Sequence, residues 1–292
     1  MRESSERIKK RRAIVLTALA GVLWGTSFPA IKIGLNYVDA YMFVFLRFFL
    51  ASIIMLFVVL VKVGGRFEFE KRRVIWFLGI ANGVAYLLQY VGMNSTSASK
   101  SSLLVNLSAI WVAILSVLIL KERLGTKRAL GIFFGILGVF LMTTNLSFQT
   151  LGQSTIIGDL LVLLSGVVWA FFTVYNKRLV SSTRDIIQPI TLILFVTLLP
   201  LIPSLYFSTS SPFQLPIEAW VAIAYTAIFC WVIPYYLWSE ALKSISAVSS
   251  TIILLTEVIV SLAVSSIMLP DTFTLISGIG AFSIIVAIVF AS

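Results

Sequence analysis

The stretch WGTSFPAIK (residues 24–32) is one of two places where a tryptophan precedes a lysine by eight residues. The other is WAFFTVYNK (residues 169–177). A second pattern also occurs twice. A Ser-Ala pair is followed after 25 residues by an acid, and the acid is followed after nine residues by a glycine. The two copies are Ser97-Ala98, Glu122 and Gly131, and Ser246-Ala247, Asp271 and Gly280. The recurrence predicts that the chain contains two copies of one unit.

The composition predicts a protein surrounded by lipid. Hydrophobic residues make up 59% and charged residues 12% of the 292 positions, whereas a soluble domain carries about 25% charged residues. Histidine, the commonest metal ligand, is absent. Cys230 is the single cysteine, so intrachain disulfides and thiolate metal clusters are excluded. We expect no metal and no cofactor.

Ten apolar segments approach the about 20 residues that a membrane helix needs. The first follows a basic run and resembles a signal peptide, but its apolar stretch is too long and nine more segments follow, so we expect it to be retained. The sequence therefore predicts an all-α membrane protein with ten transmembrane helices. The predicted spans are 13–35, 39–63, 74–94, 100–120, 128–145, 157–179, 188–207, 218–241, 247–268 and 273–291.

The basic residues predict how the chain is oriented. The N-terminal tail and every second joint carry 19 of the 22 basic residues, whereas the opposite joints carry only Lys100. The positive-inside rule then places both termini in the cytoplasm of a multi-pass protein of the cell membrane. Topology thus accounts for the net charge of +10, and we expect the lipid bilayer, not nucleic acid, as the partner.

Each copy of the repeat is predicted to contain five spans. An odd-numbered unit enters the membrane from the opposite side the second time, so the two halves become inverted copies. Inverted repeats are common in secondary transporters, which bind their substrate between the repeats near the bilayer midplane.

Several motifs resemble a known family. LWGTSFPAIK (23–32), LRFFLA (46–51), TSA (96–98) and KERL (121–124) resemble the EamA-type members of the drug/metabolite transporter superfamily. The glycines at 131, 135 and 138 fit the same pattern. The resemblance implies two EamA repeats, at 13–145 and 157–291, and export or exchange of small metabolites.

Prolines distinguish this chain from the family. Members usually carry a proline inside spans four and nine, where this chain has Ala109 and Val258. The helix-breaking device implied by the resemblance is therefore missing at both positions. Pro234 instead predicts a kink in span eight, because proline leaves a main-chain carbonyl without its helical donor.

Glu257 is the strongest candidate for function. It lies ten residues into span nine, where an acid is costly unless it faces a cavity, is paired or stays protonated. We predict that it contacts a substrate amine or couples transport to protons. The alternative is a structural partnership with Arg47 or with a Ser/Thr cluster.

Arg47, eight residues into span two, keeps its charge and must find a partner or water. It is a candidate for a two-pronged grip on a substrate carboxylate. The alternatives are snorkelling to the membrane surface and a fixed salt bridge. Arg47 together with Glu257 would suit a zwitterion such as an amino acid. Lys32 and Lys177 lie near helix ends, where snorkelling is expected.

Aromatic residues suggest the walls of a cavity. The repeat relates Trp24 to Trp169, so we predict that they form opposite walls, suited to apolar, aromatic or cationic solutes. For aromatic residues near the ends of the spans, the alternative is a position at the membrane interface, where tryptophan and tyrosine are enriched. Further predicted lining residues, with interhelical hydrogen bonding as their alternative, are Tyr86, Gln89, Tyr90 and Asn106.

Other repeated residues are predicted to be structural. The glycines of residues 131–138 form a small-residue face, either for a dimer contact or for packing within the monomer. Glu122 and Asp271 are predicted to anchor helix ends or loops through hydrogen bonds. We expect a monomer or a weak homodimer.

The function predicted from these features is secondary transport of a small molecule, with amino acids or related compounds exported by alternating access. A Walker-type nucleotide motif is absent, so the transport would be proton-coupled or facilitated. Export of drugs or cationic amphiphiles is an alternative. A lipid-modifying membrane enzyme is another, although the chain lacks histidine; we expect a protein that is not an enzyme. A channel is disfavoured, because no filter-like loop is visible.

Overall fold

The computed structural model describes residues 2–63, 72–96, 98–144, 146, 156–268 and 274–291, and every regular element in these ranges is helical. Ser97 and Asp271 lie outside the described residues. The α-helices are α1 (Arg2–Gly25), α2 (Ser27–Gly34), α3 (Ala40–Val63), α4 (Arg72–Asn94), α5 (Ala98–Asn106), α6 (Ser108–Leu120), α7 (Thr126–Thr144), α8 (Ile156–Val180), α9 (Ile187–Ser204), α10 (Ile217–Ala227), α11 (Ile233–Leu242), α12 (Ala247–Leu254), α13 (Thr256–Met268) and α14 (Leu275–Ala291). Short helical turns are η2 (Leu205–Phe207), η3 (Pro212–Gln214) and η4 (Ile228–Val232).

The helices have the length and composition of membrane spans. Within the described ranges, eight helical segments are long and apolar enough to cross a bilayer, and α14 is a shorter apolar helix. Large apolar side chains such as Phe57, Leu118 and Phe133 are exposed on the outside of the bundle, as lipid-facing residues would be. The eight segments are Glu6–Gly34, Ala40–Lys62, Arg73–Asn94, Ser101–Leu120, Ile156–Val180, Ile187–Phe207, Ile217–Leu242 and Ala247–Met268.

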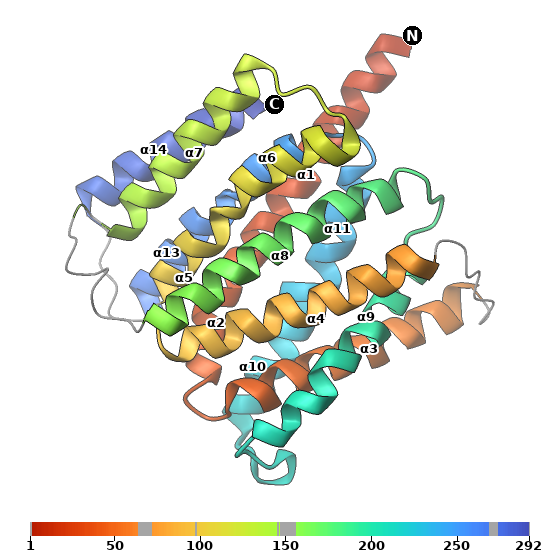
Figure 1. Cartoon of the computed structure of the whole chain (residues 1–292), viewed down its shortest axis with the longest axis vertical. Helices are drawn as coiled ribbons and strands as arrows, with labels where there is room; N and C mark the ends of the chain where they lie inside the picture. Colours follow the sequence, from red (N-terminus) through yellow and green to blue (C-terminus); the bar gives the residue numbers. More distant parts are fainter. Residues whose placement is uncertain are drawn as a thin grey trace.

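Helices α7 and α14 lie side by side at one edge of the bundle (Figure 1). Their backbones approach through glycine: a Cβ atom built on Gly138 would lie 2.6 Å from the carbonyl oxygen of Gly280. The small-residue face of α7 is therefore used for packing within the monomer, one of the two predicted roles. Elsewhere in the bundle, α4 packs against both α8 and α9.

Spans four and nine are interrupted even though Ala109 and Val258 replace the prolines. One span divides into α5 and α6 at Leu107, and the other into α12 and α13 at Leu255. The chain tightens at these points, because the N–H of Ile110 bonds the oxygen of Leu107 and that of Val258 bonds the oxygen of Leu255. These three-residue turns replace the usual four-residue step.

Each interrupted span packs against a glycine of the other half. A Cβ atom on Gly166 of α8 would lie 3.1 Å from the carbonyl oxygen of Val105, next to the break at Leu107. A Cβ atom on Gly21 of α1 would lie 3.3 Å from the oxygen of Leu254, next to the other break. Both glycines come three residues before the repeated tryptophans, a mark that the sequence prediction did not include.

Lys32 and Lys177 also make matching contacts, and they do not simply snorkel as expected. Each ammonium donates to two main-chain oxygens three residues apart, at the C-terminal end of α4 or of α11. Lysine is favourable there, because helix C-termini present unpaired carbonyl oxygens and a partial negative charge. The acceptors are Met93 (3.1 Å) and Thr96 (3.4 Å) for Lys32, and Leu242 (2.5 Å) and Ile245 (2.9 Å) for Lys177.

Glu122 anchors a helix end, as predicted. Its carboxylate accepts a hydrogen bond from the N–H of Ala247, the first residue of α12, at 3.1 Å. Ser246 completes this N-cap by accepting from the N–H of Ser249 at 3.0 Å. A negative charge at a helix N-terminus is stabilising. The first half thus orients the broken span of the second half.

Candidate binding cavity between the two halves

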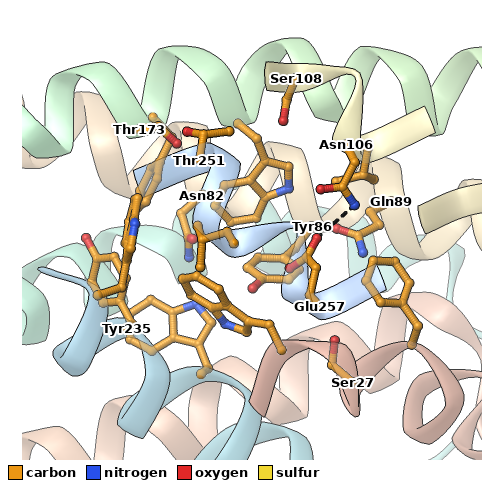
Figure 2. A pocket seen from close by; sticks show the side chains of 18 residues that line it. Ser27, Asn82, Tyr86, Gln89, Asn106, Ser108, Thr173, Tyr235, Thr251 and Glu257 are labelled. Carbon is orange, nitrogen blue, oxygen red and sulfur yellow. Dashed lines mark hydrogen bonds between the residues drawn. The ribbon is translucent and has the colours of Figure 1, made fainter. Parts of the chain in front are cut away.

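A cavity of about 100 Å³ lies in the centre of the bundle, with walls from both halves of the chain (Figure 2). Six predicted lining residues contribute to it: Trp24, Tyr86, Gln89, Asn106, Trp169 and Glu257. The other described lining residues are Ser27, Phe28, Asn82, Val105, Ser108, Phe172, Thr173, Trp231, Tyr235, Trp238, Thr251 and Leu254.

The lining residues are related by constant separations in the sequence. Sixteen of the eighteen form eight pairs, and only Asn106 and Thr251 remain outside them. Each half therefore contributes corresponding positions to one cavity. The pairs 145 residues apart are Trp24/Trp169, Ser27/Phe172 and Phe28/Thr173; those 149 residues apart are Asn82/Trp231, Tyr86/Tyr235, Gln89/Trp238, Val105/Leu254 and Ser108/Glu257.

The paired positions differ in chemistry. Asn82 and Gln89 of α4 are amides, whereas their counterparts Trp231 and Trp238 are aromatic. The first half therefore supplies much of the hydrogen-bonding wall, and the second half supplies most of the aromatic wall.

Glu257 lies in the first turn of α13, directly after the break at Leu255. The unpaired N–H groups of a helix start favour an acid there. Its carboxylate accepts a hydrogen bond from the amide nitrogen of Asn106 at 2.9 Å (Figure 2). The same nitrogen donates to the main-chain carbonyl oxygen of Ser102 at 2.9 Å. The bond between Asn106 and Glu257 joins the broken spans of the two halves. Asn106, rather than Arg47 or a Ser/Thr cluster, is the partner of Glu257.

Arg47 and Tyr90 lie behind the cavity wall. Arg47 is fully buried and is not among the lining residues. It donates to the hydroxyl of Tyr90 at 2.7 Å and to the carbonyl oxygen of Cys230 at 2.9 Å. Its guanidinium carbon lies 4.7 Å from the ring centroid of Tyr86, which does line the cavity. Arg47 thus neither snorkels nor pairs with an acid among the described residues, and the geometry does not favour the predicted contact with a substrate carboxylate.

Pro234 explains what Arg47 does. In a regular α-helix the N–H of residue 234 would bond the carbonyl of Cys230, and proline has no N–H to donate. The helix distorts into the π-helical turn η4 at this point, as the proline led us to expect for span eight. Arg47 supplies the missing donor and holds the segment that carries Trp231 into the cavity wall.

Aromatic contacts across the cavity also connect the two halves. Trp24 meets Trp238 edge to face with ring centroids 5.6 Å apart, and Trp169 meets Tyr86 in the same way at 4.8 Å. Each repeated tryptophan therefore packs on a ring of the opposite half. The indole of Trp238 is fixed by donating to the hydroxyl of Ser250 at 2.8 Å.

The sequence prediction did not select the aromatic residues Trp231, Tyr235 and Trp238 of span eight. Their signal is the separation of 149 residues from Asn82, Tyr86 and Gln89, two of which were selected. Adding the same separation to the lining positions of span three would have identified these residues of span eight.

A second set of contacts joins the halves away from the cavity. Asp39, between α2 and α3, accepts from the N–H groups of Tyr41 (2.9 Å) and Met42 (3.0 Å). Its other carboxylate oxygen accepts from the hydroxyl of Ser208 (2.7 Å) and the N–H of Ser210 (2.8 Å), beyond α9. Partial burial disfavours the charged carboxylate, but the hydrogen bonds from Met42, Ser208 and Ser210 outweigh it and lower the pKa of Asp39.

Known proteins resemble this chain over most of its length. The sequence profile of the EamA-like transporter family matches residues 11–144 and 156–292. A relative from Bacillus subtilis, named uncharacterized transporter YyaM, is 30% identical and covers 93% of this chain and 90% of its own. A relative from Archaeoglobus fulgidus, also named an uncharacterized transporter, is 29% identical over 91% of this chain and 93% of its own.

Two further comparisons concern function and fold. A protein of Salmonella typhimurium named a probable amino-acid metabolite efflux pump is 25% identical, covering 89% of this chain and 87% of its own. A solved crystal structure superposes with a TM-score of 0.77 over 96% of both chains at 15% identity, which concerns the fold alone. The family and the names of the relatives indicate a multi-pass membrane transporter rather than an enzyme.

Proposed function

Because the chain belongs to the EamA-like transporter family, we propose that it is a secondary transporter that exports small metabolites by alternating access. The observation that carries this proposal is the central cavity, whose walls come from corresponding positions of the two halves. We propose amine-bearing metabolites, amino acids and related compounds, as the substrate class. The name of the Salmonella relative supports this class.

We further propose that ten membrane helices form two inverted five-helix repeats. The eight lining pairs at separations of 145 or 149 residues support this arrangement. The matching contacts of Lys32 and Lys177 support it as well. Inverted repeats can exchange conformations, so the same cavity would open first to one side of the membrane and then to the other.

The broken spans are the elements that we propose to move. They meet at the hydrogen bond between Asn106 and Glu257, beside the cavity. A bound substrate that replaced this bond would change how the two breaks are held together. Binding would then favour one arrangement of the halves over the other.

Glu257 is also the group that we propose couples transport to protons. A carboxyl group inside the bundle is expensive as a charge and is commonly functional in membrane proteins. In the proposed cycle, Glu257 takes up a proton from outside and releases it inside as the metabolite leaves. The proposed membrane is the cell membrane, with both termini in the cytoplasm, as the distribution of basic residues supports.

Efflux from proteoliposomes tests this function. Vesicles containing the full chain would be loaded with a panel of labelled amino acids and amines, and efflux followed with and without a pH gradient. We expect gradient-dependent efflux that Glu257→Gln abolishes. Equal efflux by the variant would make Glu257 structural. Failure of the folded protein to move any panel member beyond empty vesicles would refute the assignment as an exporter of these compounds.

A further inference from the structure

We propose that the cavity selects compounds with an aromatic body and one protonated amine, and discriminates against amino acids that also carry a carboxylate. This inference rests on the proposed transport function. Within the proposed class of amine-bearing metabolites, it favours amines without a carboxylate over amino acids. It follows from three features of the described residues: the charge of the wall, the acceptors around Glu257, and the aromatic rings that line the cavity.

The first feature is the charge of the wall. Of the eighteen described lining residues, Glu257 alone has an acidic or basic side chain. A buried charge is tolerated only when it is paired and hydrogen-bonded, so a substrate ammonium has a partner here. A substrate carboxylate has none in the described wall. The zwitterion predicted from sequence needed Arg47 as its second partner.

Arg47 is committed elsewhere. It bonds the hydroxyl of Tyr90 and the carbonyl of Cys230, and the latter bond replaces the one that Pro234 cannot make. The ring of Tyr86 lies against the guanidinium and belongs to the cavity wall. The Nε–H of Arg47 has no partner among the described residues. The guanidinium nevertheless lies against the ring of Tyr86 and is not part of the described cavity wall, so a carboxylate in the cavity would reach it only after the wall rearranged.

The second feature is the set of acceptors around Glu257. Asn106 donates through its amide nitrogen to both Ser102 and Glu257, which fixes the orientation of the amide. Its amide oxygen and the second carboxylate oxygen of Glu257 are then available as acceptors. Gln89 is drawn toward the same end of the cavity in Figure 2. An ammonium, which has three donors and no acceptor, matches this set.

The third feature is the aromatic wall. Trp231 and Tyr235 pack with ring centroids 4.5 Å apart, and Trp169 joins Tyr86 at 4.8 Å. Such surfaces pack well against another ring, and their faces attract a cation. In the view of Figure 2, Tyr235 and Thr173 lie toward the end opposite Glu257 and Asn106. An amine at one end and a ring at the other therefore complement the cavity.

Three probes that differ by one group test the inference: 2-phenylethylamine, phenylalanine, which adds a carboxylate, and 2-phenylethanol, which replaces the amine by a hydroxyl. Binding to the purified full chain in lipid nanodiscs is measured by displacement of labelled 2-phenylethylamine. We expect the amine to bind about tenfold or more tightly than either of the other probes, because only the amine pairs with Glu257 without burying an unpaired carboxylate.

Two variants make the same chemical change at different acids. Glu257→Gln should remove the advantage of the amine over the alcohol. Glu240 pairs with Lys243 at 2.7 Å and is not among the residues that line the cavity. Glu240→Gln should therefore keep the advantage of the amine over the alcohol. The comparison of probes on the unaltered chain stands even if a variant fails to fold.

Phenylalanine binding as tightly as the amine would overturn the inference, as would an unchanged preference in Glu257→Gln. Binding of none of the three probes would overturn it too. The efflux panel separates these results from failure of the proposed function, because export of an amino acid without binding of the amine leaves a transporter with a different substrate.

Discussion

The two halves of this molecule use one framework for different chemistry. Gly21, Trp24 and Lys32 make the same kinds of contact as Gly166, Trp169 and Lys177. Ser108 and Glu257, which correspond at a separation of 149 residues and follow the two breaks, differ in chemistry although both line the cavity. The repeat therefore fixes where side chains lie, and the departures from the repeat provide the charge.

Arg47 and Pro234 form a second departure. At the separations of 145 and 149 residues found for the lining pairs, Arg47 corresponds to Leu192 or Val196, and Pro234 of span eight corresponds to Ala85, so neither has a counterpart of its own type. They meet at the carbonyl of Cys230, where the proline removes a donor and the arginine replaces it. The comparison suggests that a distortion introduced in one half is stabilised by a residue of the other half.

The largest predicted effect comes from breaking this pair. Arg47→Leu should lower the free energy of unfolding by about 2–4 kcal/mol, because two buried acceptors lose their donor. Pro234→Ala restores the N–H that the Cys230 carbonyl lacks. The loss caused by Arg47→Leu should therefore be smaller when Pro234→Ala is also present.

Thermal unfolding of the two single variants and the double variant in nanodiscs measures this coupling. Additive changes would contradict the view that Arg47 replaces the donor missing at Pro234. Leu192→Ala, at the position 145 residues after Arg47, provides a control without a buried charge.

The next effect concerns a position where making the halves alike should be harmful. Gly25 corresponds to Ala170, yet a Cβ atom on Gly25 would lie 2.6 Å from the carbonyl oxygen of Glu257. Gly25→Ala should cost about 1–3 kcal/mol, because backbone must shift to admit the methyl group. Ala170→Gly should cost only about 1 kcal/mol through helix propensity, plus a small term for the lost methyl group.

Unfolding temperatures of the two variants test this contrast. Gly25→Ala should also weaken amine binding, since Glu257 is the residue displaced. A tolerated Gly25→Ala with unchanged binding would show that the close approach of α1 to α13 is not required.

A smaller effect is expected when the acid is moved between the halves. Glu257→Ser should lose about tenfold in affinity for 2-phenylethylamine, the loss of one charge pair. Adding Ser108→Glu to that variant places the acid at the corresponding position and should recover part of the affinity. The displacement assay measures both changes, and no recovery would show that the framework does not make the two positions equivalent.

The sequence was sufficient to predict the family, the helical class and six of the eighteen described residues of the cavity wall. Trp24 and Trp169 were found because their spacing to lysine recurs, and Glu257 because an acid inside an apolar span is costly. Arg47 was harder to interpret, because its partner is a main-chain carbonyl freed by a proline 187 residues later. The breaks at Leu107 and Leu255 carry no proline or glycine, so local sequence gives no sign of them.

The smallest predicted effect compares two helix caps in corresponding joints. Asp39 caps α3 through Tyr41 and Met42 and also binds the segment beyond α9, whereas Asp185 caps α9 through the N–H of Ile187 at 2.9 Å. The pKa of Asp39 is lowered in the folded protein, so its contribution to stability is present above the ordinary aspartate pKa near 4 and is lost as the pH falls through the folded value.

The unfolding temperature of the unaltered chain should therefore fall more steeply below pH 4 than that of Asp39→Asn, whose amide does not titrate. Asp185→Asn should retain the steeper fall, because it leaves the bonds of Asp39 intact. Parallel curves for the unaltered chain and Asp39→Asn would show that the contacts between Asp39 and Ser208–Ser210 do not stabilise the assembled halves.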